Sequence, residues 1–221
     1  MIKLERTEIF GWEAAIRGMR NPLNSWEKSD SYWTHIEDPG TEMTANFEFF
    51  VGDNDLDLMK RLHAAGTDHG KFMRMLTVYV DITAPLYWWK EFDTYKVGTV
   101  ANSCSTMHKI HAKEFTLDDF SHEHLEMLIH DGETYDFRWD LKDIVGTLNL
   151  ARTKYLETKD KRYWWQMIQL LPTSYNQKRT VMLNYEVLAN MYKSRKNHKL
   201  DEWHDLCAWI ECLPYSKLIT D

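Results

Sequence analysis

Polar residues recur within an otherwise apolar pattern near the C-terminal end of the chain, and on a helix Asn184 and Arg195 lie on one face, whereas Asn190 points away from it. Apolar residues recur among them every three or four positions, which predicts a helix that begins near position 179 and is buried on two sides. A buried arginine needs a partner, and a bound anion would provide one. The structural alternative is an arginine that extends from the core to solvent or pairs with Glu186 or another carboxylate.

A second polar segment covers residues 98–106 and is rich in small side chains, among them Asn102, Ser103, Cys104 and Ser105. Hydroxyl groups and backbone N–H groups in such a loop can contact a phosphate. The segment lacks the glycine spacing of the commoner nucleotide-binding loops. On its own it does not specify a ligand.

Histidines concentrate between positions 108 and 130, a distribution that raises the question of a metal site. The run HEHLE differs from the HExxH motif of zinc enzymes. Residues 118–130 are instead predicted to form an exposed helix whose Leu125, Leu128 and Ile129 face inward. No metal site is expected, and a metal hydrolase stays open as a third interpretation. The histidines concerned are His108, His111, His122, His124 and His130.

The composition describes a globular protein of one domain, residues 1–221. Its 221 residues carry a formal net charge of -7, so the chain has no basic field for a nucleic-acid polymer. The three cysteines lack CxxC spacing and no apolar run reaches the roughly 20 residues of a membrane span, which predicts a cytoplasmic protein without a membrane segment. Ten tryptophans indicate a heavily packed core or a subunit interface, and therefore an oligomer.

Strand-like and helix-like segments alternate irregularly along the chain. Strands are predicted over residues 1–10, 44–51 and 72–82, and helices over 54–65, 84–94, 140–156, 160–171 and 200–213, in addition to the short helix that ends before Pro22. His69 lies at the start of the strand over 72–82, where a capping or solvated histidine is favoured over a ligand-binding one.

Two segments together resemble the flavin-dependent thymidylate synthases, in the same order and over roughly residues 58–210. Members of that family carry a segment of the form RAPxxxxRQxxRHRxxSxNExSxR, and residues 83–106 read TAPLYWWKEFDTYKVGTVANSCST. Ala84 and Pro85 fit this pattern, whereas Lys90 and Glu91 stand in place of Arg-Gln. The second segment is similar to the family's LP(x11)N(x5)N(x4)R pattern, with Leu171-Pro172, Asn184, Asn190 and Arg195 at the expected spacings.

The resemblance implies roles for these residues. It places Arg195 against a uracil carbonyl as the catalytic residue, and it places Asn184, Asn190 and His198 against a flavin. Asp68, His69 and Phe72 look like the family's Glu-His-x-x-Phe, which makes His69 a further flavin contact, together with Tyr95 and Lys96. The implied substrate-binding residues are Lys90, Glu91, Asn102, Ser103, Cys104, Ser105 and Arg195.

The resemblance further implies an α+β fold with a mixed or antiparallel sheet and packed helices. It implies a homotetramer that binds FAD and a pyrimidine nucleotide at subunit boundaries, with NADPH and methylenetetrahydrofolate as co-substrates in one-carbon transfer to dUMP. Three family arginines are replaced by Thr94, Thr106 and Glu186, which removes donors worth on the order of 1.5 to 3 kcal/mol each. A noncatalytic oligomeric descendant that binds a nucleotide or a protein is therefore the alternative.

Overall fold

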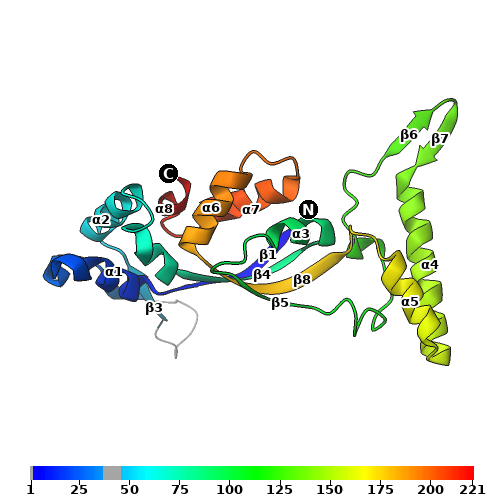
Figure 1. The fold of residues 1–221 in the computed structure, drawn as a ribbon, viewed down its shortest axis with the longest axis horizontal. Helices are drawn as coiled ribbons and strands as arrows, with labels where there is room; N and C mark the ends of the chain where they lie inside the picture. The colour runs from blue at the N-terminus through cyan, green and yellow to red at the C-terminus, as the bar shows by residue number, and fades with distance from the viewer. Residues whose placement is uncertain (1, 37–45) are drawn as a thin grey trace.

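A four-stranded antiparallel sheet forms the centre of the molecule (Figure 1). The computed structural model describes residues 2–36 and 46–221. The strand order is β1-β4-β8-β5, with β1 over Lys3–Phe10, β4 over Thr77–Pro85, β8 over Asn176–Asn184 and β5 over Val100–Ser103. The two central strands pair along their whole length, from Thr77 opposite Asn184 to Pro85 opposite Asn176. The sheet confirms the prediction of an α+β fold with antiparallel strands.

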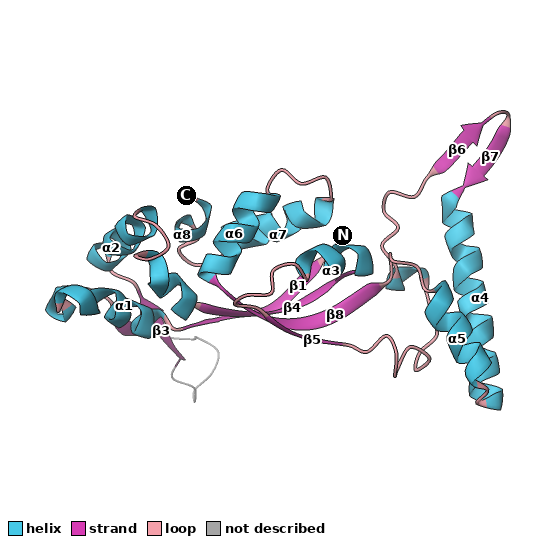
Figure 2. Cartoon of the chain, in the orientation of Figure 1, coloured by secondary structure: helices cyan, strands magenta, loops and turns pink. Residues whose placement is uncertain are grey.

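One face of the sheet is covered by helices (Figure 2). In β4, the alternate residues Val78, Val80 and Ile82 are buried, whereas Tyr79 on the other face is 40% exposed. Helices α3 (Leu86–Phe92), α6 (Tyr185–Arg195) and α7 (Asp201–Glu211) lie over the buried face. Burial of every second residue is the pattern expected of an antiparallel sheet that is covered by helices on one face only.

The end of the sheet where β1 finishes and β4 begins is packed by α1 (Trp12–Arg20), α2 (Asp53–Ala64), α8 (Lys217–Thr220) and the 3-10 helix Gly70–Met75. Gly11 has a φ of 101° and turns the chain from β1 into α1 against the backbone of Met75, so a Cβ there would lie 2.1 Å from the Met75 carbonyl oxygen. Short 3-10 helices at Asn21–Leu23 and Trp26–Lys28 lead to the hairpin of β2 (Tyr32–Ile36) and β3 (Asn46–Phe50).

The opposite end of the sheet carries a separate arm with its own core (Figure 1). It contains the 3-10 helix Leu117–Asp119, the hairpin of β6 (Met127–His130) and β7 (Glu133–Asp136), and helices α4 (Phe137–Thr158) and α5 (Lys161–Leu170). Phe120, Leu148 and Met167 are central to this second apolar cluster. No helix within the described ranges is long and apolar enough to cross a membrane.

Three predictions about local structure are wrong. Residues 179–184 belong to β8 rather than to a helix. No α-helix forms over 118–130: Leu117–Asp119 is a 3-10 helix, residues 127–130 form a strand, and Leu128 and Ile129 are 52% and 70% exposed rather than facing inward. Residues 100–103 form the edge strand β5 rather than a loop. The strand predicted over 72–82 begins later and continues to Pro85, because a 3-10 helix occupies 70–75, and part of the strand predicted over 44–51 lies outside the described residues.

A buried ion pair holds α1, α2 and the segment between them together. Arg20 Nε donates to Asp55 Oδ1 at 2.6 Å, and the hydroxyls of Ser29 and Ser31 donate to Asp55 Oδ2 at 2.6 and 2.7 Å. Burial opposes ionisation of Asp55, but the hydrogen bonds from Ser29, Ser31 and Arg20 outweigh it and lower the pKa of this carboxyl. The ionised form is therefore stabilised in the folded state.

Replacing Asp55→Asn is expected to lower the free energy of unfolding by about 3 to 5 kcal/mol, since Arg20 is then buried without a counter-charge. Urea denaturation measures the loss, and the exposed Asp57→Asn on the same helix is the control, with an expected change below about 0.5 kcal/mol. Because the folded pKa of Asp55 is depressed, its contribution is present above about pH 4 and is lost as the pH falls further. Equal stability of Asp55→Asn and the wild type would contradict this role.

Candidate functional site

The junction of β8 and α6 positions the polar residues singled out in the sequence. Asn184 ends β8 and caps α6, because its side-chain oxygen accepts a hydrogen bond of 3.0 Å from the Val187 backbone N–H. Leu188 and Met191 are fully buried and fix the rotation of the helix. Arg195 therefore lies at the last turn of α6, facing α3 and α7.

Arg195 is held in a cluster of aromatic and acidic side chains. Its Nε donates to the Tyr95 hydroxyl at 2.9 Å and its Nη1 donates to Glu91 Oε2 at 2.9 Å. The guanidinium lies over the Trp203 ring, 4.6 Å from its centroid. These contacts leave the Arg195 side chain only 18% exposed, so its orientation is fixed before any ligand arrives.

Glu91 is the acceptor that joins the cluster. Besides Arg195, its Oε2 accepts a hydrogen bond from Trp203 Nε1 at 2.9 Å and lies 3.2 Å from His198 Nε2. Glu91 is placed by α3, whose Trp88, Trp89 and Phe92 are buried in the core, while the neighbouring Lys90 is exposed. The chain thus has a fixed carboxylate beside a fixed guanidinium.

Both groups keep hydrogen-bonding capacity. Within the described residues, Glu91 Oε1 and Arg195 Nη2 have no protein partner. A carboxylate oxygen accepts and a guanidinium nitrogen donates, so these two atoms have the chemistry to bind a ligand that carries both a carbonyl and an N–H, such as a cyclic amide or imide.

A second hydrogen-bonded pair, Tyr87 and Glu202, adds a carboxylate to the same helices. The Tyr87 hydroxyl donates to the buried Glu202, which ties α3 to α7. Burial, followed by the Glu202 carboxylate, raises the pKa of Tyr87 above its usual value. Tyr87 is therefore a neutral hydrogen-bond donor throughout the ordinary pH range.

Other predicted flavin residues lie apart from this cluster. The side chains of His69, Lys96 and Asn190 are exposed and make no hydrogen bond or ion pair with the rest of the described chain. The Asn184 oxygen is occupied by the helix cap, which leaves its amide nitrogen for a ligand. Within a single chain, Tyr95, Arg195 and His198 thus lie together with Glu91. His69, Lys96 and Asn190 lie on the surface.

The predicted phosphate-contacting segment follows the sheet edge. Asn102 pairs with Thr180 and Ser103 with Arg179. Cys104 and Ser105 line a hollow of about 250 Å³ with Lys113 and Lys178. The Ser105 hydroxyl accepts from the backbone N–H groups of Met107 and His108, so it stabilises a turn. These residues do not contact Arg195.

Glu186, which replaces a family arginine, is part of an ion pair rather than an anion site. Arg74 donates to both of its carboxylate oxygens, at 2.6 and 2.9 Å. Arg179, a second guanidinium near the sheet, pairs with Asp93 at 2.7 Å and lies 4.1 Å from the Trp89 ring centroid. Both arginines are therefore already paired with carboxylates.

The histidine-rich segment is dispersed. His122 Nδ1 contacts the Phe120 carbonyl, and His124 and His130 lie beside Asp201 and Asp131. Among the described residues, no group of three or more His, Cys, Asp or Glu side chains is arranged to hold a metal ion. A metal hydrolase built on these histidines gains no support.

Trp203 is the residue of the cluster that the sequence did not identify as functional. Its spacing with Leu206 and Ile210 predicts only the buried stripe of an amphipathic helix, and it is indeed fully buried. Its indole N–H nevertheless orients Glu91 while its ring supports Arg195. The sequence signal for this role was a tryptophan that follows Arg195 closely in the chain.

The overall fold is similar to solved structures of nucleotide-modifying enzymes. Flavin-dependent thymidylate synthase ThyX from Helicobacter pylori, complexed with FAD and dUMP, aligns with a TM-score of 0.68 and 16% identity over 98% of this chain and 97% of that chain. The UMP/dUMP methylase PolB from Streptomyces cacaoi, bound with 5-Br dUMP, aligns with a TM-score of 0.60 and 13% identity over 100% of this chain and 95% of that chain. No family model and no curated protein matches the sequence. At these identities the likeness shows the fold.

Removing the α6 cap is expected to weaken the protein itself. Asn184→Ala leaves the Val187 N–H without its partner and is expected to lower the free energy of unfolding by about 0.5 to 2 kcal/mol in the absence of any ligand. Asn190→Ala, on the exposed side of the same helix, is the control and is expected to change it by less than about 0.5 kcal/mol. Thermal or urea denaturation measures both. A larger loss for Asn190→Ala would refute the structural assignment of Asn184.

Proposed function

We propose that the chain is a flavin-dependent thymidylate synthase-like protein that binds a uracil-type deoxynucleotide at Arg195 and Glu91. The observation that carries the proposal is the fixed donor beside a fixed acceptor, with Arg195 Nη2 and Glu91 Oε1 both without a partner among the described residues. A uracil ring presents a carbonyl next to its N3–H, which matches this pair. Two solved structures that are similar in fold are bound to dUMP and to 5-Br dUMP.

The charge near the cluster supports an anionic ligand. Lys90 is exposed next to Glu91, Lys96 is exposed next to Tyr95, and neither forms an ion pair within the described residues. A phosphate on the ligand would gain from such cations although the net charge of the chain is negative. Lysines contact phosphate as point charges, so binding is expected to weaken with salt.

FAD is the cofactor that the proposal places beside the nucleotide. The free amide nitrogen of Asn184, both polar atoms of Asn190 and the exposed ring of His69 are compatible with its carbonyl and ring-nitrogen atoms. When bound, the reduced flavin would supply the hydride, and methylenetetrahydrofolate and NADPH would supply the one-carbon unit and the electrons. The protein's part is to hold the pyrimidine and to stabilise charge on its carbonyl through Arg195.

A homotetramer belongs to the same proposal. Several apolar side chains on the arm face solvent in the single chain: Leu128 is 52% exposed, Ile129 is 70% exposed and Trp139 is 62% exposed. A two-stranded hairpin is marginal by itself, and burial of such residues between subunits would stabilise it. Residues on different sides of α6 would then meet ligands at subunit boundaries.

The second candidate is a noncatalytic descendant that binds a nucleotide or a protein partner. The Glu91 carboxylate favours it, because it offsets part of the positive charge that Arg195 would direct at a developing negative charge. The pairing of Glu186 with Arg74 favours it as well. Both candidates share the nucleotide site and differ in turnover.

Arg195→Ala is expected to weaken dUMP binding about 10- to 150-fold, the range for one charge-assisted hydrogen bond. Isothermal titration calorimetry on the purified protein measures the change, and Lys193→Ala, exposed two residues earlier on α6, is the matched control. Equal affinity of Arg195→Ala and the wild type would contradict a pyrimidine site at this residue.

The visible absorption spectrum and tritium release from dUMP labelled at C5 separate the two candidates. The catalytic candidate gives a flavin spectrum, and release that depends on methylenetetrahydrofolate and is lost in Arg195→Ala. The noncatalytic candidate gives dUMP binding without release. A protein that binds neither added FAD nor dUMP would eliminate the catalytic proposal.

A further inference from the structure

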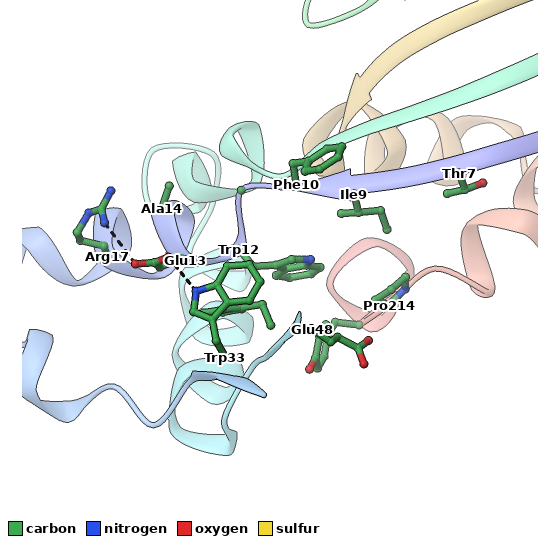
Figure 3. A pocket seen from close by; sticks show the side chains of 13 residues that line it. Thr7, Ile9, Phe10, Trp12, Glu13, Ala14, Arg17, Trp33, Glu48 and Pro214 are labelled. Carbon is green, nitrogen blue, oxygen red and sulfur yellow. Dashed lines mark hydrogen bonds and ion pairs between the residues drawn. The ribbon is translucent and has the colours of Figure 1, made fainter. Parts of the chain in front are cut away.

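An aromatic hollow lies at the other end of the sheet from the histidine-rich arm. Its volume is about 850 Å³, and it is lined by residues of β1, α1, the β2–β3 hairpin and the segment before α8. Figure 3 shows the side chains around it, with Trp12 and Trp33 contributed by separate elements. None of the residues in the Arg195 cluster lines this hollow.

The aromatic walls are fixed by the protein. Trp12 meets Tyr215 edge to face at 5.0 Å between centroids, and Trp33 meets Phe49 edge to face at 5.1 Å. The Trp33 indole N–H donates to Glu13 Oε2 at 3.1 Å, which holds the ring although Trp33 is 56% exposed (Figure 3). Leaving a fixed tryptophan half in solvent is unfavourable unless something covers its face.

The charged lining is predominantly negative. Glu13 and Glu48 line the hollow against one cation, Arg17, whose Nη1 lies 3.8 Å from Glu13. Glu48 is exposed and forms no ion pair within the described part of the chain. An unneutralised carboxylate in the same hollow as the exposed ring of Trp33 attracts a cation and disfavours an anion.

We propose that this hollow binds a small organic cation with an apolar or aromatic body. The exposed ring of Trp33 attracts an alkylated ammonium group through the quadrupole of the indole, Trp12, which is 9% exposed, forms part of the apolar wall, and Glu48 supplies the counter-charge. The volume lies within the range of about 300 to 1,000 Å³ for small-molecule sites, so the ligand extends beyond the ammonium group. This site is chemically opposite to the anion-binding site proposed at Arg195.

Saturation-transfer NMR with phenyltrimethylammonium and its uncharged isostere tert-butylbenzene tests the proposal on the full-length protein. The cation is expected to bind and the isostere to bind at least about tenfold more weakly, the scale of a partly desolvated cation–π contact. Absence of binding by the cation, or equal binding by the isostere, would overturn the proposal.

Two variants locate the site. Trp33→Leu keeps an apolar side chain but removes the ring, and it is expected to weaken cation binding about tenfold. Glu48→Gln keeps the shape and removes the charge, with an expected weakening of severalfold that shrinks as salt is added. Glu157→Gln on α4 is the matched control for charge. If neither Trp33→Leu nor Glu48→Gln binds the cation more weakly than Glu157→Gln, the site is not this hollow.

Folding of each variant is checked by its thermal transition. Glu48 is exposed, so Glu48→Gln tests the proposal even if Trp33→Leu disturbs the hairpin. Trp33→Phe retains a ring and is expected to retain most of the affinity. The readout is ligand affinity, and it is independent of flavin content and of any turnover.

Discussion

The ion pair between Arg195 and Glu91 is the interaction on which the candidate site depends. It joins α6 to α3 across 104 residues of sequence, and Trp203 from α7 both supports the guanidinium and donates to the carboxylate. Three helices that cover one face of the sheet therefore meet at one polar cluster. Since each charged group already has a partner, the cluster is stable without a ligand and still retains unused donors and acceptors.

The sheet and the two ends of the molecule determine what surrounds that cluster. Continuous pairing of β4 with β8 places the start of α6 opposite the start of β4, and the Asn184 cap fixes the direction in which α6 leaves the sheet. The arm has its own apolar core and exposes further apolar residues, whereas the other end contains the buried Arg20–Asp55 pair and the aromatic hollow. The anion-compatible and cation-compatible sites thus lie on different parts of one fold.

Several elements follow from local sequence signals, and others require tertiary contacts. Helix α2 follows from an N-cap candidate at Asn54 and a stop at Gly66, and α4 and α5 match the helical stretches over 140–156 and 160–171. The helix predicted from position 179 begins only at Tyr185, because Leu183, Val187 and Met191 have helical spacing, while Val181 and Leu183 also alternate as a buried strand does. Only the pairing with β4 decides between a helix and a strand at residues 179–184. The β6–β7 hairpin had a recognisable signal, Asp131-Gly132, and both residues have the positive φ of a hairpin turn.

Only part of the candidate site follows from the sequence, and its connections do not. Arg195, Tyr95, His198 and Glu91 were all identified from spacing and resemblance, and the structure brings them together. Their mutual pairing was not predictable, because it depends on how α3 and α7 pack on α6. Asn184 illustrates the reverse case, in which a residue identified as a ligand contact also serves as a helix cap.

The proposed site requires Arg195 and Glu91 together to recognise a carbonyl and the neighbouring N–H of a uracil ring. Calorimetric titration with dUMP and with its analogue methylated at ring nitrogen N3 tests it most directly, because the two ligands share the sugar, the phosphate and both carbonyls. We expect dUMP to bind at least about tenfold more tightly, since the methyl group removes the hydrogen bond to Glu91 and crowds its carboxylate. Equal affinity for the two nucleotides, or no binding of dUMP, would contradict it.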